Sequence, residues 1–109
     1  MKQDEKEFAA LRKYPRAVVS LPCHILFPNN ERVLALVQAL SEGGAQIEML
    51  EDCEVLESVS ISVPISNSYN LSLNGKRKWK NGIRFGIEFS NLCSRDKHVL
   101  SKLVHYHRL

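Results

Sequence analysis

The stretch SVSISVPI, residues 58–65, decides the fold class, because every second side chain in it is apolar. Neighbouring side chains of a β-strand point to opposite faces, so an alternation with period two is typical of a strand with one buried face. The residues expected to face inward are Val59, Ile61, Val63 and Ile65. Three serines and a proline fall on the other face, and the stretch therefore predicts a half-buried strand.

The same alternation continues downstream. Residues 69–73 keep the period toward Trp79, and Asn74-Gly75 interrupts it as either a tight turn or a bulge, which the sequence alone leaves open. Asn81-Gly82 predicts a hairpin with a type I′ turn, because both residues tolerate positive φ. Residues 83–89 alternate again and form the last predicted strand.

Three more strands are predicted upstream. Residues 17–27 alternate, and Pro22 among them places this strand near a sheet edge or a bulge. After a turn at 28–31, the apolar run 32–40 fits a strand or a short helix, and its β-branched valines and its length favour a strand. Residues 45–49 predict a further strand.

The end of the chain follows a helical period. It predicts an amphipathic helix with Ser94 as the N-cap and Asp96 in the first turn. The apolar positions of this helix are Leu92, Val99, Leu100, Leu103 and Val104. Five or six short antiparallel strands and one helix indicate an all-β domain, a small barrel whose open end the helix covers.

The chain of 109 residues is long enough for one small domain with a single core. We expect a flexible tail at 1–11 and one domain at 12–109. The longest apolar run, Val33 to Val37, is far shorter than the roughly 20 residues of a membrane helix, so no membrane span is expected.

Two features favour a cytoplasmic location. The charged N-terminus MKQDEKEF lacks the apolar core of a secretory signal. The three cysteines, Cys23, Cys53 and Cys93, are isolated and odd in number, which suits reduced thiols better than disulfides. We interpret all three as packing residues.

The formal net charge of +3 is spread unevenly. Basic residues cluster at 12–16 and at 76–84, and the acidic stretch at 51–57 separates them. A local anion site is therefore more natural than a nucleic-acid track, and no DNA or RNA partner is expected. In the alternative of a basic barrel that binds single-stranded nucleic acid, Trp79 would stack on a base, although a lone Trp also suits core or rim packing.

Two motifs suggest where an anionic ligand would bind. Arg12 and Arg16 stand four residues apart before the first strand, and a guanidinium fork matches phosphate oxygens or the Hoogsteen edge of guanine. Solvated loop charges are the plainer interpretation. ALSEGG, residues 39–44, places a serine and two glycines between two strands, where a turn can present N–H groups and a hydroxyl.

Taken in order, RKYPR at 12–16, the strand after it, ALSEGG at 39–44 and IRFGIEF at 83–89 resemble the PilZ domain family from about residue 8 to residue 109. The signature of that family is Arg-x-x-x-Arg, followed by Asp/Asn-x-Ser-x-x-Gly. The resemblance implies a six-stranded antiparallel β-barrel capped by a C-terminal α-helix. It also implies a stand-alone bacterial receptor for cyclic di-GMP, with a role in motility or biofilm regulation.

The resemblance also implies roles for individual residues. Arg12 and Arg16 would grip the phosphates and guanines of cyclic di-GMP, and Ser41 and Gly44 would meet a guanine from the barrel surface. The N-terminal segment would become ordered around the ligand, and an effector protein that the sequence does not identify would recognise the changed surface.

Three further residues are second candidates for this site: Leu11, Gly43 and Trp79. In the family, the residue before the first arginine is associated with the number of bound dinucleotides, and the non-cationic Leu11 favours a single molecule. Gly43 belongs to the same turn as Ser41, and Trp79 offers a ring for stacking.

One position departs from the family pattern. Ala39 stands where the family has Asp or Asn, and it can neither accept a hydrogen bond from guanine nor orient an arginine. A hydrogen bond that involves a charged group contributes about 1.5 to 3 kcal/mol, which is about ten- to over a hundredfold in affinity. The alternative is therefore a degenerate PilZ adaptor that binds a protein partner and not cyclic di-GMP.

No other constellation predicts chemistry. Four histidines lack the spacing of zinc ligands, namely His24, His98, His105 and His107. Ser41 lacks a nucleophile elbow, and the chain has no Walker loop. We therefore expect no enzyme, no metal and no cofactor, with cyclic di-GMP as the ligand.

Overall fold

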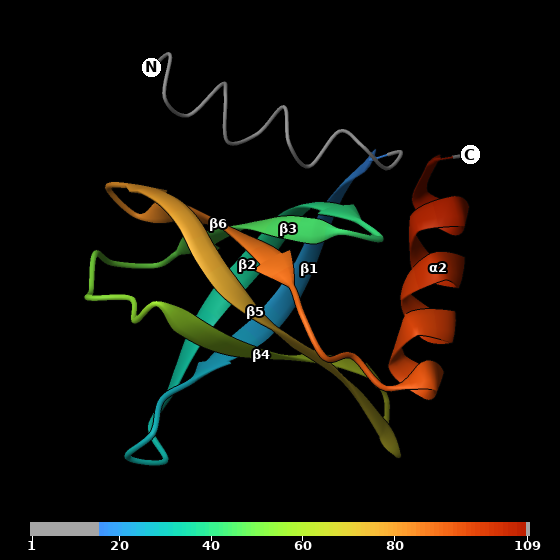
Figure 1. Cartoon of the computed structure of the whole chain (residues 1–109), viewed down its shortest axis with the longest axis horizontal. Helices are drawn as coiled ribbons and strands as arrows, with labels where there is room; N and C mark the ends of the chain where they lie inside the picture. Colours follow the sequence, from blue (N-terminus) through green and yellow to red (C-terminus); the bar gives the residue numbers. More distant parts are fainter. Residues whose placement is uncertain (1–15, 109) are drawn as a thin grey trace.

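A computed structural model describes residues 16–108 of the chain, which form six strands and one helix (Figure 1). These elements are β1 (Arg16–Leu26), β2 (Arg32–Ser41), β3 (Gly44–Met49), β4 (Ser58–Ser66), β5 (Tyr69–Asn81), β6 (Arg84–Phe89) and α2 (Ser94–Arg108). The strands pair antiparallel and close into a barrel in the order β1-β2-β3-β6-β5-β4. The predicted barrel with a terminal helix is confirmed, as is the strand at 32–40.

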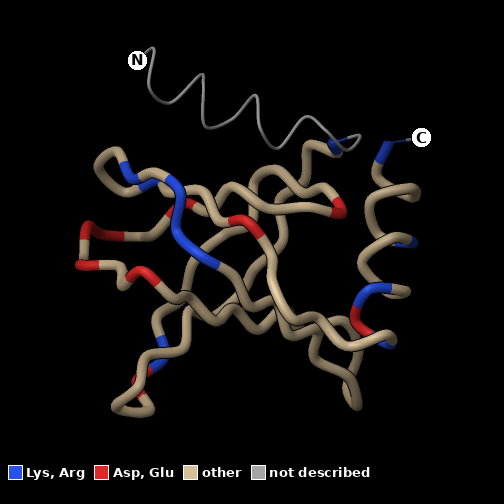
Figure 2. Tube along the Cα trace, in the orientation of Figure 1, with Lys and Arg blue, Asp and Glu red and all other residues tan. Residues whose placement is uncertain are grey.

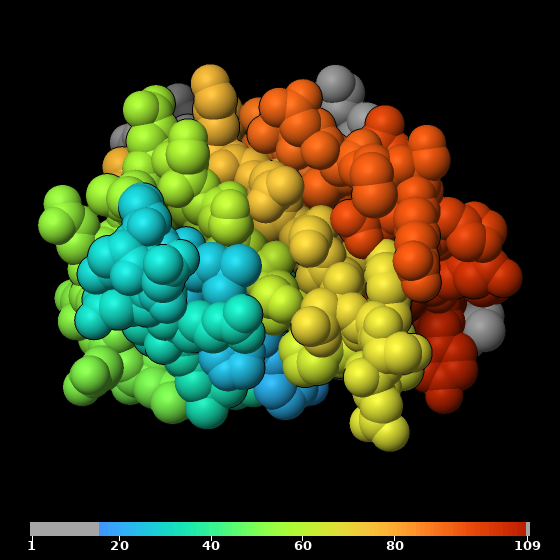
Figure 3. All heavy atoms as spheres, turned by 90° about the horizontal axis from the view of Figure 1, so that it is seen from below, coloured from blue at the N-terminus to red at the C-terminus, as the bar shows by residue number. Residues whose placement is uncertain are grey.

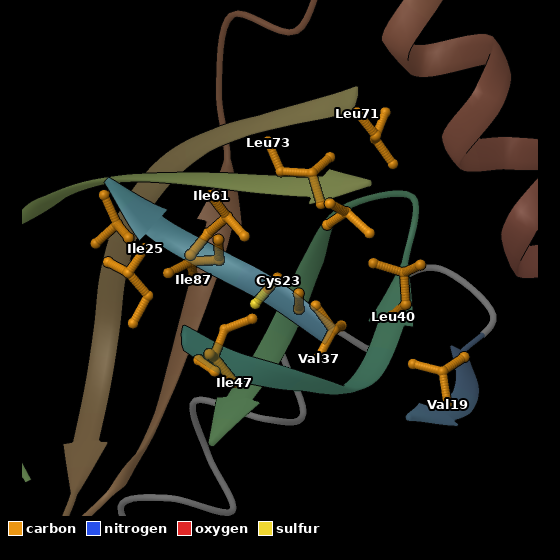
Figure 4. Close-up of a cluster of buried hydrophobic side chains, with 14 of the residues drawn as sticks. Val19, Cys23, Ile25, Val37, Leu40, Ile47, Ile61, Leu71, Leu73 and Ile87 are labelled. Atoms are coloured by element: carbon orange, nitrogen blue, oxygen red, sulfur yellow. The ribbon is translucent and has the colours of Figure 1, made fainter. Parts of the chain in front are cut away.

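The core of the barrel is built from the inward-facing apolar side chains. Cys23 of β1, Ile47 of β3 and Ile87 of β6 are fully buried and converge from different walls (Figure 4). Burying a large apolar side chain contributes roughly 1.5–3 kcal/mol, so this cluster is the main source of stability. Burial also raises the pKa of the Cys23 thiol to about 12, which fits its predicted packing role.

The alternation of β4 ends earlier than the sequence suggests. Val59, Ile61 and Val63 are buried, but Ile65 is 39% exposed, so the inward placement predicted for it is wrong. The pairing of β4 with β5 shifts register between Pro64 and Ser66. A bulge changes which face of the sheet the following side chains occupy, so the period-two pattern no longer predicts burial beyond it.

Gly75 lies inside β5 and is neither a turn nor a bulge. It pairs with Val59 on one side and with Phe89 on the other, where β5 passes from one partner strand to the next. A Cβ atom at this position would lie 2.3 Å from the carbonyl oxygen of Glu88. The strand therefore needs glycine because a neighbouring backbone approaches closely.

The hairpin between β5 and β6 is confirmed, but its predicted type I′ turn is wrong. Asn81 pairs with Arg84, so the two loop residues are Gly82 and Ile83. Gly82 has a φ of 64°, and neither Asn81 nor Ile83 is among the described residues with positive φ. Positive φ at the first loop residue alone is typical of a type II′ turn, which prefers glycine there.

The N-cap of α2 is Cys93 and not the predicted Ser94. The carbonyl oxygen of Cys93 accepts a bond from the Lys97 amide at 3.0 Å, and its sulfur accepts one from the Asp96 amide at 3.4 Å. The thiol also donates to Asp96 Oδ2 at 3.1 Å, so the Cys93 side chain bonds both the amide and the carboxylate of Asp96. Cys93 is exposed, and its predicted packing role is wrong, whereas Cys53 is half-buried.

The helix covers a part of the barrel where β1 has little pairing with β4. Those strands pair only over His24–Leu26, and β1 shifts register between Val18 and Leu21, beside Pro22. The predicted bulge near Pro22 is therefore present. The helix packs against β1, β5 and β2 and buries Leu100 and Val104.

Candidate ligand-binding site

The two motifs of the candidate site meet where β1 begins. Arg16 is the first residue of β1 and pairs directly with Ser41, the last residue of β2. The structure thus brings the second arginine of the first motif beside the serine of the second. Arg12 and Leu11 lie outside the described residues.

Ser41 holds the turn between β2 and β3 together. Its side chain is buried, and its Oγ accepts hydrogen bonds from the amides of Gly43 and Gly44, each at 3.1 Å. The hydroxyl donates to the carbonyl oxygen of Gly44 at 3.4 Å, and the Phe89 amide of β6 donates to the Gly43 carbonyl at 2.9 Å. The turn therefore uses its own N–H groups and hydroxyl internally, and Ser41 fixes its shape.

A row of outward-facing residues next to this turn crosses five strands, from β1 to β5. Val18 of β1, which is 88% exposed, pairs with Ala39 of β2, Ala39 pairs with Gln46 of β3, and Gln46 pairs with Gly86 of β6. Directly opposed residues share a face of a sheet, so Ala39 lies on the outer wall of the barrel. Sequence reasoning missed Val18 and Gln46, because only the register of the strands brings them beside Ala39.

Trp79 ends this row on β5. It pairs with Gly86, and a Cβ atom on that glycine would lie 2.2 Å from Trp79 Nε1, so the ring covers the glycine from outside. The residue is half-buried, and within residues 16–108 its indole N–H is buried without a hydrogen-bond partner. Trp79 packs on the wall of the barrel and not in its core.

A groove of about 340 Å³ adjoins the turn on the side of α2. It is lined by Glu42 of the turn, by Lys97 and Leu100 of the helix, and by residues 89–92 between β6 and the helix. Glu42 and Lys97 place charges of opposite sign on its two sides.

Two lysines of the late basic cluster are paired with acidic residues of the same chain. Lys78 Nζ lies 3.3 Å from Glu88 Oε1, and Lys80 Nζ lies 2.6 Å from Asp52 Oδ1. Figure 2 shows the basic stretch of β5 running between acidic segments. These ion pairs reduce the positive charge that the two lysines offer to an anionic ligand.

The described residues offer few other kinds of site. No group of three or more His, Cys, Asp or Glu side chains among residues 16–108 is placed to hold a metal ion. Over the same range, no helix is long and apolar enough to cross a membrane.

Comparison with solved structures places this fold among PilZ domains. The PilZ domain of YcgR from Escherichia coli with c-di-GMP superposes with a TM-score of 0.73 at 14% identity, covering 89% of this chain and 91% of that one. The PilZ domain of CeSA from a cellulose-synthesizing bacterium gives 0.66 at 14% identity, covering 86% and 98%.

MotI/DgrA, an inhibitor of motility from Bacillus subtilis, gives a TM-score of 0.70 at 14% identity over 89% of this chain. This chain spans only 50% of the length of that protein. At such identities these likenesses show the fold alone.

Sequence comparison gives the family directly. No curated protein sequence matches the chain. The family model of the PilZ domain matches residues 10–106, which is nearly the whole chain. The order of the strands, the meeting of the two motifs and this match agree, and the chain belongs to the PilZ domain family.

Proposed function

We propose that this protein is a cytoplasmic receptor that binds cyclic di-GMP and has no catalytic activity. The pairing of Arg16 with Ser41 carries the proposal, because it sets a guanidinium fork beside the turn of the second motif. Solved PilZ domains of similar fold, such as that of YcgR, contain c-di-GMP. The free thiol of the exposed Cys93 suits a reducing compartment.

In this proposal the ligand lies on the outer wall of the barrel. Arg16 and Arg12 grip phosphates and guanines, and the turn of Ser41, Gly43 and Gly44 supports a guanine edge. Ser41 contributes by holding the turn, since its hydroxyl already bonds to that turn. The N-terminal segment orders around the ligand, and an effector protein then recognises the new surface.

Calorimetric titration with cyclic di-GMP, at low and at physiological salt, tests the proposal. Arg16→Ala removes a charged donor and is expected to weaken binding by about tenfold or more. Arg32→Ala is the matched control, because Arg32 is an exposed arginine at the other end of β1 and β2. Equal binding by wild type and Arg16→Ala would exclude this site, and no binding by the wild type would exclude the receptor.

The second candidate is an adaptor that binds a partner protein but not cyclic di-GMP. Ala39 favours it, because the outer wall has a methyl group where the family has an Asp or Asn side chain.

The two functions differ in what they predict for the natural protein, and Ala39→Asp is the variant to compare with it. A receptor with a weakened site gains affinity, by about tenfold or more from one charged hydrogen bond. The control is Ala39→Ser, which adds a hydroxyl without a charge. The adaptor is contradicted if the natural protein already binds tightly, whereas the receptor is contradicted if only the variant binds.

A further inference from the structure

A groove of about 240 Å³ lies at the end of the barrel opposite Arg16 and Ser41. One side is the turn between β1 and β2, with Phe27, Pro28 and Glu31, and the other is the segment 50–57, with Glu54 and Leu56. Figure 3 views this end, with the cyan turn in front of the green segment. Arg16 is the first residue of β1, so residues 17–26 of that strand separate it from the groove.

The segment 50–57, which we call the acidic segment, is fixed in place although it is irregular. Val55 is buried, and its carbonyl oxygen accepts a hydrogen bond from Arg77 Nη1. Lys80 binds Asp52 at 2.6 Å, and the Arg77 amide donates to the Glu57 carbonyl at 2.8 Å. A surface held by such contacts loses little conformational entropy when a partner binds.

The groove exposes apolar surface between these fixed walls. Leu56 is 44% exposed, although the residue before it in the chain, Val55, is buried. Phe27 and Leu56 also line a slot of about 10 Å³ that continues inward, so the floor of the groove is closed by the core. Pockets for small molecules usually enclose about 300–1,000 Å³, so a groove of this size suits an anchoring side chain better than a whole small ligand.

The rim of the groove is acidic, in a protein whose net charge is +3. Glu31 and Glu54 line it and Glu51 is exposed on the same segment, whereas the nearby cations Arg77 and Lys80 are bonded to Val55 and Asp52 and Arg32 begins β2. Among residues 16–108, Glu51 and Glu54 have no ion-pair partner, since the pair in this segment involves Asp52. Charge complementarity across an interface steers association, so a partner segment is expected to be basic.

We propose that this groove docks a basic amphipathic segment of a partner protein, which places an apolar anchor against Phe27 and Leu56 and cations against Glu31 and Glu54. The inference goes beyond nucleotide binding and does not depend on it, because the groove and the candidate ligand site lie at opposite ends of β1. The adaptor and the receptor would both use it.

The test uses a synthetic helical peptide with Leu at positions i, i+3, i+4 and i+7 and Lys elsewhere, titrated into the full chain and followed by amide chemical shifts. Shifts are expected to concentrate at residues 27–31 and 50–57. A matched peptide with Glu in place of Lys is expected not to bind. Leu56→Ser and Glu54→Lys are each expected to weaken binding by about tenfold.

Glu42→Lys is the control variant, because it makes the same charge change at the other end of the barrel. Circular dichroism of each variant confirms the fold. Four outcomes overturn the proposal: no binding of the Lys peptide, shifts elsewhere on the barrel, equal weakening by Glu42→Lys, or self-association of the free protein through this groove. The last outcome would assign the groove to a second copy of the chain.

Discussion

At the scale of single residues, two glycines are required by contacts that the sequence does not reveal. Gly75 faces the backbone of Glu88 and Phe89, and Gly86 faces the ring of Trp79. Backbone in the middle of a barrel moves only if the pairing of strands is broken, whereas a side chain on the outer wall can change rotamer. The two positions therefore differ in what an added methyl group costs.

Gly75→Ala is expected to lower the free energy of unfolding by about 1–3 kcal/mol, because its Cβ would lie 2.3 Å from a backbone oxygen. Urea unfolding measures this loss. Gly86→Ala is the matched comparison. We expect it to lower the free energy of unfolding by less, because the ring of Trp79, the single tryptophan, can rotate outward. That rotation should shift the tryptophan fluorescence to the red. Equal losses, with no change in Trp79 emission, would contradict this account.

At the scale of elements, the start of α2 is tied to β5 by a cluster of polar side chains. Tyr69 donates a hydrogen bond to Asp96, Cys93 donates to the other oxygen of the same carboxylate, and the guanidinium of Arg95 lies 4.3 Å from the centre of the Tyr69 ring. Burial and the bond to Asp96 raise the pKa of Tyr69 to about 12. Burial would raise the pKa of Asp96, but the bonds from Tyr69 and Cys93 outweigh it and hold that pKa below its usual range.

Asp96→Asn should therefore destabilise the protein in a pH-dependent way. A lowered pKa in the folded state stabilises the fold above the unfolded-state value of about 3.9, and this contribution is lost as the pH falls through the folded-state pKa. We expect Asp96→Asn to lose about 1 kcal/mol near neutral pH, and wild type and variant to converge as the pH falls through the folded-state pKa of Asp96.

The measurement for Asp96 is urea unfolding of both proteins across this acidic range. Glu88→Gln is the control, since the exposed pair of Glu88 with Lys78 is expected to contribute less than about 0.5 kcal/mol. A difference between wild type and Asp96→Asn that stays constant with pH would show that the charge of Asp96 is not involved.

The elements themselves could be predicted from the sequence, but their ends could not. Period-two alternation located the strands because one face of each is buried in a closed barrel. The N-cap was misplaced because a serine is the stronger capping residue by propensity, yet the geometry of the chain put Cys93 at that position. The hairpin turn moved by one residue because the register of β5 and β6, which propensity does not encode, set its ends.

The candidate site was predictable only in part for a similar reason. The spacing of the motifs identified Arg16, Ser41 and Gly44 as site residues. The pairing of β1 with β2 is what brings Arg16 beside Ser41 in space. The outer row from Val18 to Trp79 depends on four separate strand registers. The internal use of the Ser41 hydroxyl depends on the shape of one turn, which spacing cannot give.

At the scale of the whole molecule, the barrel and the helix share one core. Leu100 and Val104 of α2 are buried in the same cluster as the inward side chains of the strands. The barrel is closed by pairs between strands that are distant in the sequence, such as β1 with β4 and β3 with β6. Neither part keeps its apolar surface covered without the other, so the protein should unfold in one cooperative step.

Val104→Ala tests this cooperativity, because it removes two buried carbon atoms from the joint between helix and barrel. We expect a loss of about 2 kcal/mol in the free energy of unfolding, from lost burial and the cavity that remains. In urea, the fluorescence of Trp79 reports the barrel and far-UV circular dichroism includes the helix, so both midpoints should fall together. Tyr106→Ala, at an exposed position of α2, is the control and should shift neither by much. A lower midpoint for the helix signal alone would mean that α2 unfolds by itself, and the barrel would then be the only cooperative unit.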